Sequence, residues 1–419
     1  MENLNSDLIT EQDLDRYLET YDKQPICDYT ISEHLFDFDN YGKSFTQVAI
    51  VLEPSSPLHV NGKKVYFVAS EGGHDNGREL IYDNDKEEAI GPWLARRGIT
   101  FIALCRIGRW NFFTQHSLGS WFDIPLEKRV PIYNRHQKSD WAENQYFTEA
   151  AKEISSSTGS LACRVAKQGS ELEEFMLAAT PATVVKGFQI ALHALIREPR
   201  DKALLLYWGF STGGPYMWGL SKSYTPDGIA GFGMTNFPLS RFASASAHGK
   251  FSWLYEASAC RIRERGKPDF LFYAQGMTEE QIERRYQEAL HSPRFKSTED
   301  SFMFLNIAAL TEMLTRLSRA DFLPVELKNG GLAKIFKENF DLVYPDQSLS
   351  SLKVLELFGT KDEIFLGTPD LMQAIQTTSG YCKKYKVTFL ENLHHCTDAE
   401  QSRRFGSVWL EAIVNGYFN

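Results

Sequence analysis

The first feature of this sequence is how little cysteine it contains. Its 419 residues include 6 cysteines, and they are scattered without the paired spacings that a zinc site or a disulfide framework requires. We therefore expect no metal site, reduced thiols and a cytoplasmic protein. The cysteines are Cys27, Cys105, Cys163, Cys260, Cys382 and Cys396.

The chain also lacks long apolar and long basic runs. Nothing approaches the roughly 20 apolar residues of a membrane span, and residues 1–21 are polar and acidic, which is unlike a secretory signal. The 45 basic and 54 acidic residues give a net charge of −9, without a basic run that would follow a phosphate backbone. We expect a small-molecule substrate and neither a membrane nor a nucleic acid as partner. The oligomeric state stays open, a homo-oligomer included.

The length of the chain predicts more than one structural unit, because it exceeds the usual ceiling for a single hydrophobic core. The first part of a catalytic core is expected over residues 1–239, with an insertion at 110–177 that is punctuated by Pro, Gly and Ser. A largely helical cap is expected over 240–344. The core resumes over 345–419.

Apolar strand-like runs alternate with helical spacings in both parts of the core. After two extended segments, 29–38 and 44–52, strands are expected at Lys64–Ala69, Ile99–Cys105, Ala203–Trp208, Ile229–Met234, Leu352–Phe358 and Lys386–Leu390. Helices are expected at Lys86–Arg97, Pro181–Ile196, Pro215–Leu220, Pro369–Ser379 and Glu400–Val414. This alternation predicts an α/β fold with a mostly parallel central sheet that is flanked by helices.

A glycine-rich turn joins one of these strands to the next helix. It reads Gly209-Phe210-Ser211-Thr212-Gly213-Gly214, which is a GxSxG motif between a strand and a helix. Such an elbow needs glycine where strand and helix approach closely, lifts the serine hydroxyl off the sheet and offers the Thr212 N–H to an oxyanion. We interpret Ser211 as a nucleophile. The alternative is a turn that only packs.

An activated serine needs a base and an acid further along the chain. The strand that ends near Phe358 runs into a Gly-Thr-Lys turn and then Asp362, and the next strand is followed by His394 and His395. The order serine, aspartate, histidine fits the motif. We prefer His395 as base because it leaves a longer loop, and His394 is the reserve. The alternatives are an ordinary turn aspartate and a surface histidine.

A second oxyanion donor is expected in the loop Glu71–Asp75, where glycines let the backbone approach a reacting carbonyl. We assign the Gly73 N–H to this role, and a flexible turn is the alternative. Aromatic residues gather between Trp110 and Tyr146, where they could line a cleft. Two arginines and three of these aromatic residues could approach the cleft: Arg106, Arg109, Trp110, Phe112 and Phe113. The preferred interpretation is a solvated basic patch over packed rings, and the cluster 261–267 is interpreted as a solvated helix face.

These residues together resemble the α/β-hydrolase superfamily, from about Lys64 to Leu220 and again from Leu352 onward. The resemblance implies acyl transfer in which Ser211 attacks a carbonyl, Thr212 and Gly73 hold the oxyanion, and His395, oriented by Asp362, protonates the leaving group. It implies no metal and no organic cofactor. One departure is Glu71-Gly72 in place of the His-Gly pair that is common in the oxyanion loop.

The resemblance leaves the bond that is cleaved open. Carboxylic esters of small apolar or aromatic molecules are the expected substrates, because ester hydrolysis makes the least demand on leaving-group protonation. Amides, lactones, thioesters and carbon–carbon bonds next to a ketone are alternatives. So are an acyltransferase or lyase that uses the same triad, and a non-catalytic binding protein on this fold.

Overall fold

The computed structural model of the protein describes residues 6–70, 80–81, 88–105, 107, 180–210, 213–232, 342–343, 345–361, 371–393 and 401–419. The predicted insertion at 110–177 and all of the predicted cap except residues 342–343 lie outside these ranges.

The described elements alternate between strands and helices. The strands are β1 (Ser6–Ile9), β2 (Tyr29–Asn40), β3 (Lys43–Pro54), β4 (His59–Val60), β5 (Lys63–Ser70), β6 (Thr100–Cys105), β7 (Ala203–Phe210), β8 (Gly228–Phe232), β9 (Lys353–Gly359) and β10 (Lys384–Leu390). The helices are α1 (Glu11–Asp22), α2 (Ile90–Ala95), α8 (Pro181–Leu195), α9 (Gly214–Ser223), α18 (Leu371–Ser379) and α20 (Ser402–Val414), with 3₁₀ turns at Arg200–Lys202 and Gln347–Leu349.

All of these strands belong to one sheet in the order β1-β10-β9-β8-β7-β5-β6-β3-β2, and β4 pairs with β5. From β1 to β6 the neighbours along this path are parallel. Strand β3 is antiparallel to β6, and β2 and β3 form a long antiparallel hairpin. Because β5 to β10 run the same way, their carboxyl ends meet at one edge of the sheet and their amino ends at the other.

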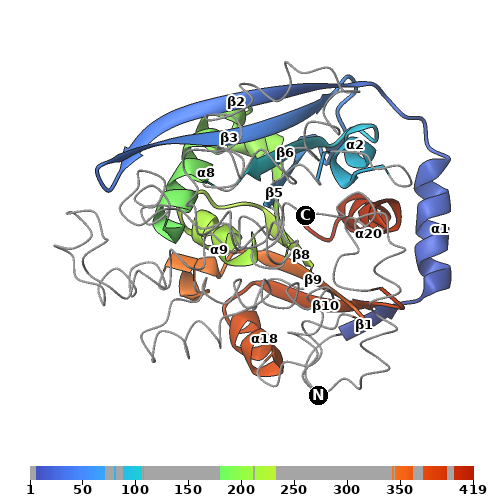
Figure 1. Ribbon diagram of the computed structural model, residues 1–419. Coiled ribbons are helices and arrows are strands. Elements are labelled where there is room, and N and C mark those ends of the chain that lie inside the picture. Colours follow the sequence, from blue (N-terminus) through green and yellow to red (C-terminus); the bar gives the residue numbers. More distant parts are fainter. Residues whose placement is uncertain are drawn as a thin grey trace, which may run out of the picture.

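Helices cover both faces of the sheet (Figure 1). Alternate side chains of the central strands pack into the core on one face or the other. On one face, Leu204, Leu206 and Trp208 of β7 belong to a core that also includes residues of α1, α2 and α20. On the other, Leu205 and Tyr207 belong to a core shared with α8 and α9. Burial on both faces explains why β7 reads as a continuous apolar run.

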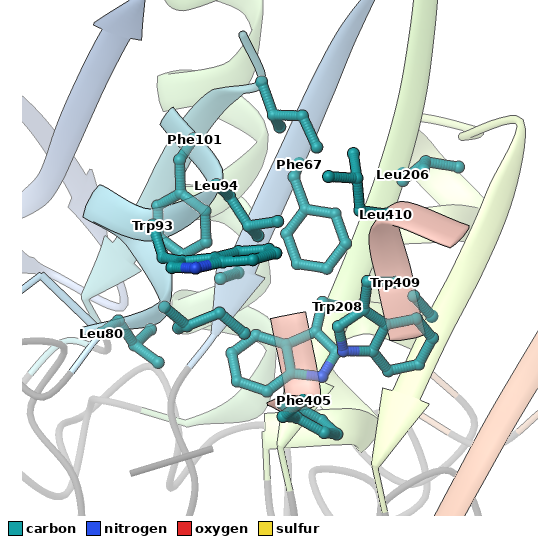
Figure 2. Close-up of a cluster of buried hydrophobic side chains, with 14 of the residues drawn as sticks. Phe67, Leu80, Trp93, Leu94, Phe101, Leu206, Trp208, Phe405, Trp409 and Leu410 are labelled. Carbon is teal, nitrogen blue, oxygen red and sulfur yellow. The ribbon is translucent and has the colours of Figure 1, made fainter. Parts of the chain in front are cut away.

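Aromatic rings form the centre of the core beneath α2 and α20 (Figure 2). The Trp208 ring lies 6.1 Å from Phe67 and 6.0 Å from Phe405, centroid to centroid. Phe405 and Trp409 meet edge to face at 5.5 Å, a favoured geometry for aromatic pairs. The last helix of the chain is thereby fixed over the strand that leads to the glycine-rich turn.

The structure confirms the predicted α/β architecture, a mostly parallel central sheet with helices on both faces. Each strand expected from the sequence is present with shifts of a few residues at its ends. The helix expected over 86–97 is shorter, since α2 covers Ile90–Ala95. After α2 the backbone passes through Gly98 at φ +85°, a conformation that favours glycine.

The sequence reasoning missed the first two elements, β1 and α1. Strand β1 adds to the edge of the sheet beside β10. Helix α1 begins with a capping box in which Thr10 accepts from the Asp13 N–H and the Asp13 carboxylate accepts from the Thr10 N–H. It buries Leu14 and Tyr21, and Tyr17 and Leu18 pack partly buried against the same core, so its apolar residues follow the i, i+3, i+4, i+7 spacing of an amphipathic helix.

Three further observations concern the described ranges alone. Within them, no helix has both the length and the apolar character needed to cross a membrane. No group of three or more metal-binding side chains comes together in the same parts of the chain. Cys27, Cys105 and Cys382 are free thiols.

Candidate active site

Strand β7 delivers the chain to the predicted nucleophile. All eight of its residues are buried, and it ends at Phe210, directly before Ser211. Helix α9 begins at Gly214, with Pro215 in its first turn and Gly213 already at helical angles (φ −69°, ψ −24°). The strand-turn-helix context that the motif requires is therefore present, and Ser211 and Thr212 themselves lie outside the described residues.

Gly209 shows how tightly the strand and the helix meet. A Cβ atom added at this position would lie 2.8 Å from the Cα of Gly214 and 2.9 Å from its nitrogen, closer than real Cβ contacts allow. The obstacle is backbone rather than a side chain that could rotate away. Glycine is required at 209 because the backbones of β7 and α9 approach each other here.

The ends of β9 and β10 are joined by hydrogen bonds just before the predicted acid and base. The Thr360 N–H donates to the Leu390 carbonyl at 2.9 Å, and the Lys361 N–H donates to the Leu393 carbonyl at 3.0 Å. The Asn392 N–H donates to the Thr360 hydroxyl at 2.8 Å. The last described residue before Asp362 is thus bonded to the last one before His394.

The register of the sheet brings the remaining strand ends to the same edge. Ser70, the last residue of β5, pairs with Gly209, and Gly209 pairs with Gly231 of β8. Gly359 at the end of β9 pairs with Leu390 at the end of β10. The loops that carry the predicted oxyanion donor, nucleophile, acid and base therefore all leave this edge, where ligands bind in open α/β sheets.

The predicted site residues themselves lie outside the described part of the chain. This holds for the triad residues, the reserve histidine, the two oxyanion donors and the residues proposed to line a cleft. They are Ser211, Asp362, His395, His394, Thr212, Gly73, Arg106, Arg109, Trp110, Phe112 and Phe113. What the structure describes is the set of strand ends from which their loops start.

One more described group at this edge is Ser70. Its side chain is fully buried, and its hydroxyl has no hydrogen-bond partner among the residues that the structure describes. Since it pairs with Gly209 in register, it lies beside the glycine of the elbow. A buried hydroxyl without a partner reduces the stability of the folded state. Packing alone therefore does not explain why a serine stands at position 70.

The N-terminal segment forms hydrogen bonds with the carboxyl edge of the sheet, and the sequence did not predict this contact. The Glu391 N–H donates to the Ile9 carbonyl at 3.0 Å, and the Glu391 carboxylate accepts from the Glu11 N–H at 2.9 Å, at the start of α1. A carboxylate is favourable at a helix N-terminus. Strand β1 and helix α1 therefore hold the turn from which the histidine loop starts, and no local signal in the sequence reveals this contact.

Comparison with known proteins gives similarity at the level of structure. No protein-family model and no curated protein sequence matches this chain. Among solved structures, a thermostable carboxyl esterase from Bacillus coagulans matches with a TM-score of 0.45 and 11% identity, covering 93% of this chain and 100% of that one.

Two other solved structures have similar scores. A proline iminopeptidase from Mycobacterium smegmatis has a TM-score of 0.43 and 14% identity, covering 92% of this chain and 99% of that one. A carboxylesterase from Bacillus subtilis has a TM-score of 0.41 and 13% identity, with 96% and 99% coverage.

Proposed function

We propose that the protein is a serine hydrolase that cleaves carboxylic esters of small apolar or aromatic molecules. Ser211 is the nucleophile, His395 the base and Asp362 the acid that orients it. The Thr212 and Gly73 N–H groups form the oxyanion hole. The observation that carries the proposal is that β7 ends directly before Ser211, at the same sheet edge as the hydrogen-bonded ends of β9 and β10.

The spacing of the strands supports a three-part relay. At about 4.8 Å per strand, β7 lies roughly 10 Å from β9 and 14 Å from β10. Asp362 belongs to the loop after β9, two strands from the elbow, and an imidazole between this carboxylate and Ser211 is the group that completes the relay. The loop after β10 has to fold back across β9 and β8, and His395 gives it one residue more than His394.

The chemistry follows from these roles. His395 removes the Ser211 proton as the hydroxyl attacks the ester carbonyl, and Asp362 fixes the tautomer of the imidazole and stabilises its protonated form. The Thr212 N–H, just before helix α9, and the Gly73 N–H stabilise the developing oxyanion. His395 then protonates the leaving alcohol, and water attacks the acyl-enzyme by the reverse sequence.

Covalent labelling tests the nucleophile. A fluorophosphonate should modify the wild-type protein once, on the peptide that contains Ser211, while Ser211→Ala should stay unlabelled with an unchanged melting temperature, because the change removes a hydroxyl and no core volume. Ser223→Ala is the matched control, since this serine lies at the far end of helix α9 and, within the described residues, its hydroxyl donates to the Leu220 carbonyl. Labelling of Ser211→Ala at the wild-type rate would overturn the assignment.

Two histidine variants test the base. We expect His395→Ala to lower kcat on a chromogenic ester by at least about 10³-fold, as loss of the base does in serine hydrolases, and His394→Ala to lower it far less. The reverse ranking would give the role to His394. Running the reaction with competing acceptor alcohols shows whether the acyl group goes to water, as proposed, or to a second substrate.

A further inference from the structure

The opposite edge of the sheet contains a pocket that the proposed hydrolysis does not use. Its volume is about 530 Å³, and it lies where β5, β7, β8, β9 and β10 begin. Strand β7 has eight residues, so at about 3.3 Å per residue the pocket is roughly 25 Å from the elbow. The lining residues are Asn61, Lys63, Arg200, Leu204, Thr225, Pro226, Asp227, Ser351, Lys353, Lys383, Phe418 and Asn419.

The lining is strongly cationic in a chain whose net charge is −9. Lys63, Arg200, Lys353 and Lys383 are all among the lining residues, and Asp227 is the one carboxylate side chain among them. These lysines come from separate places in the sequence and are gathered by the register of the sheet. Such an excess of one sign on a single pocket raises the local concentration of ions of the opposite sign.

Asp227 is already satisfied by its neighbours. Its carboxylate forms an ion pair with Arg200 at 2.7 Å and another with Lys63 at 3.3 Å. The oxygen that meets Arg200 also accepts from the Leu205 N–H at 2.8 Å. The Asp227 carboxylate therefore has little capacity left to neutralise Lys353 and Lys383.

Arg200 is held in place as well. Its guanidinium donates to the carbonyls of Ala203 and Thr225 in addition to Asp227. An arginine whose donors are directed at the backbone fixes the geometry of the pocket wall. A ligand would meet Arg200 through its charge and the lysine ammonium groups through direct contact.

Lys353 and Lys383 supply the surplus charge. Lys353 donates to the main-chain oxygen of Asn419, and neither lysine forms an ion pair with a carboxylate side chain in the described part of the chain. Burial lowers the pKa of Lys353, and the nearby charges of Lys383 and Lys384 lower it further. An anion between these ammonium groups would relieve that repulsion.

We propose that this pocket binds a small anion that carries a phosphoryl group. A phosphate group concentrates nearly two negative charges and three acceptor oxygens at one point, which suits several point-charge lysine donors better than a single carboxylate does. Asn61, Thr225 and Ser351 add neutral polar groups, and Leu204 and Phe418 give an apolar wall. Because the chain as a whole is acidic, a large polyanion is repelled and a small one is not.

Isothermal titration of the full chain tests the proposal with three probes at constant ionic strength: inorganic phosphate, phenyl phosphate and benzoate. Both phosphates should bind, and benzoate should not. Tighter binding of phenyl phosphate identifies an organic phosphate as the ligand class, and equal binding identifies free phosphate. Binding of benzoate as tight as that of phenyl phosphate, or no phosphate binding, would overturn the proposal.

Variants place the binding in this pocket. Lys353→Gln combined with Lys383→Gln should weaken phosphate binding by about tenfold or more, since it removes two charge-assisted contacts. Lys202→Gln, a nearby exposed residue that does not line the pocket, should change it less than about twofold, because screened charges at a distance contribute little. Lys383 is exposed, so Lys383→Gln alone keeps the test valid if the double variant does not fold. Unchanged binding in Lys383→Gln would contradict the site.

Discussion

The two edges of the central sheet differ in the kind of residue that ends each strand. At the carboxyl edge, strands β5, β7 and β9 end in Ser70, Phe210 and Gly359, and the backbones of β7 and α9 almost touch. At the amino edge, β5, β9 and β10 start with Lys63, Lys353 and Lys384. The three named residues at the first edge are neutral and buried, and the three at the second edge are lysines that reach solvent.

This difference has a physical reason. Catalysis by a serine requires a fixed backbone and a dry environment, where a few N–H donors act strongly on a developing charge. Recognition of an anion needs only surplus charge at a surface that water can reach. One parallel sheet can provide both, because its two edges gather different sets of loops from the same strands.

The largest effect is expected at the carboxyl edge, from Asp362→Asn. Loss of the acid leaves the imidazole in the wrong tautomer, so kcat should fall by about 10⁴-fold with little change in stability. The measurement is ester hydrolysis together with the melting temperature. Glu363→Gln is the matched control and should retain near wild-type activity. An equally small loss in the two variants would show that Asp362 does not orient the base.

The next effect is expected from Gly209→Ala. The added methyl would overlap the backbone of Gly214, and relieving such a clash costs about 1–3 kcal/mol in the free energy of unfolding. Activity should fall as well, because the turn that carries Ser211 has to shift. Chemical denaturation and ester hydrolysis measure the two losses.

Gly380→Ala serves as its control. There the added Cβ would lie 3.4 Å from its nearest neighbour, the Thr377 carbonyl, which is ordinary van der Waals contact. We expect nearly unchanged stability and activity. If Gly209→Ala behaved in the same way, the close approach of β7 and α9 would not be what positions the nucleophile.

A smaller effect is expected from Thr360→Val. The hydroxyl of Thr360 accepts the Asn392 N–H, and its loss should reduce stability by about 1 kcal/mol. This bond joins the two loops that carry the proposed acid and base. We therefore expect kcat to fall several-fold and KM to change less.

Thr225→Val makes the same change at the amino edge, where the hydroxyl donates to the Ser221 carbonyl. It should cost similar stability and leave kcat unchanged. Equal kcat values in the two threonine variants would show that the contact between the ends of β9 and β10 has no catalytic consequence.

How much of this could be predicted from the sequence depends on how far apart the interacting residues lie. The strand β7 and the elbow were predictable, since an apolar run, a GxSxG motif and a proline stand next to one another in the chain. The mostly parallel sheet followed from the alternation of strands and helices. All of these signals are local.

Contacts between distant residues could not be predicted in this way. Glu391 caps α1 across 380 positions, and Thr360 joins Asn392 across 32. The lysines of the amino-edge pocket lie at or next to the starts of strands that are far apart in the sequence, and only the register of the sheet gathers them. Helix α1 is different, because its signals are local and were missed: Thr10 and Asp13 form a capping box, and Leu14, Tyr17, Leu18 and Tyr21 follow a helical spacing.

Helix α9 connects the two edges, and the smallest predicted effect concerns its far end. It begins beside the elbow, and its Lys222 forms an ion pair with Asp346 at 2.6 Å. Burial raises the pKa of Asp346, but hydrogen bonds from Lys222 and Ser348 outweigh burial and leave that pKa below its usual value. The carboxylate therefore stabilises the folded state above its unfolded pKa of about 3.9, and this contribution is lost as the pH falls below that value.

We expect Asp346→Asn to reduce stability at pH 6 by no more than about 1 kcal/mol, because the pair is half exposed. The difference from the wild type should shrink between about pH 4 and pH 3, as measured by denaturation at each pH. Ester hydrolysis by Asp346→Asn should be unchanged, since the pair lies at the end of α9 that is distant from Ser211. A loss of activity would mean that the two edges are coupled through this helix.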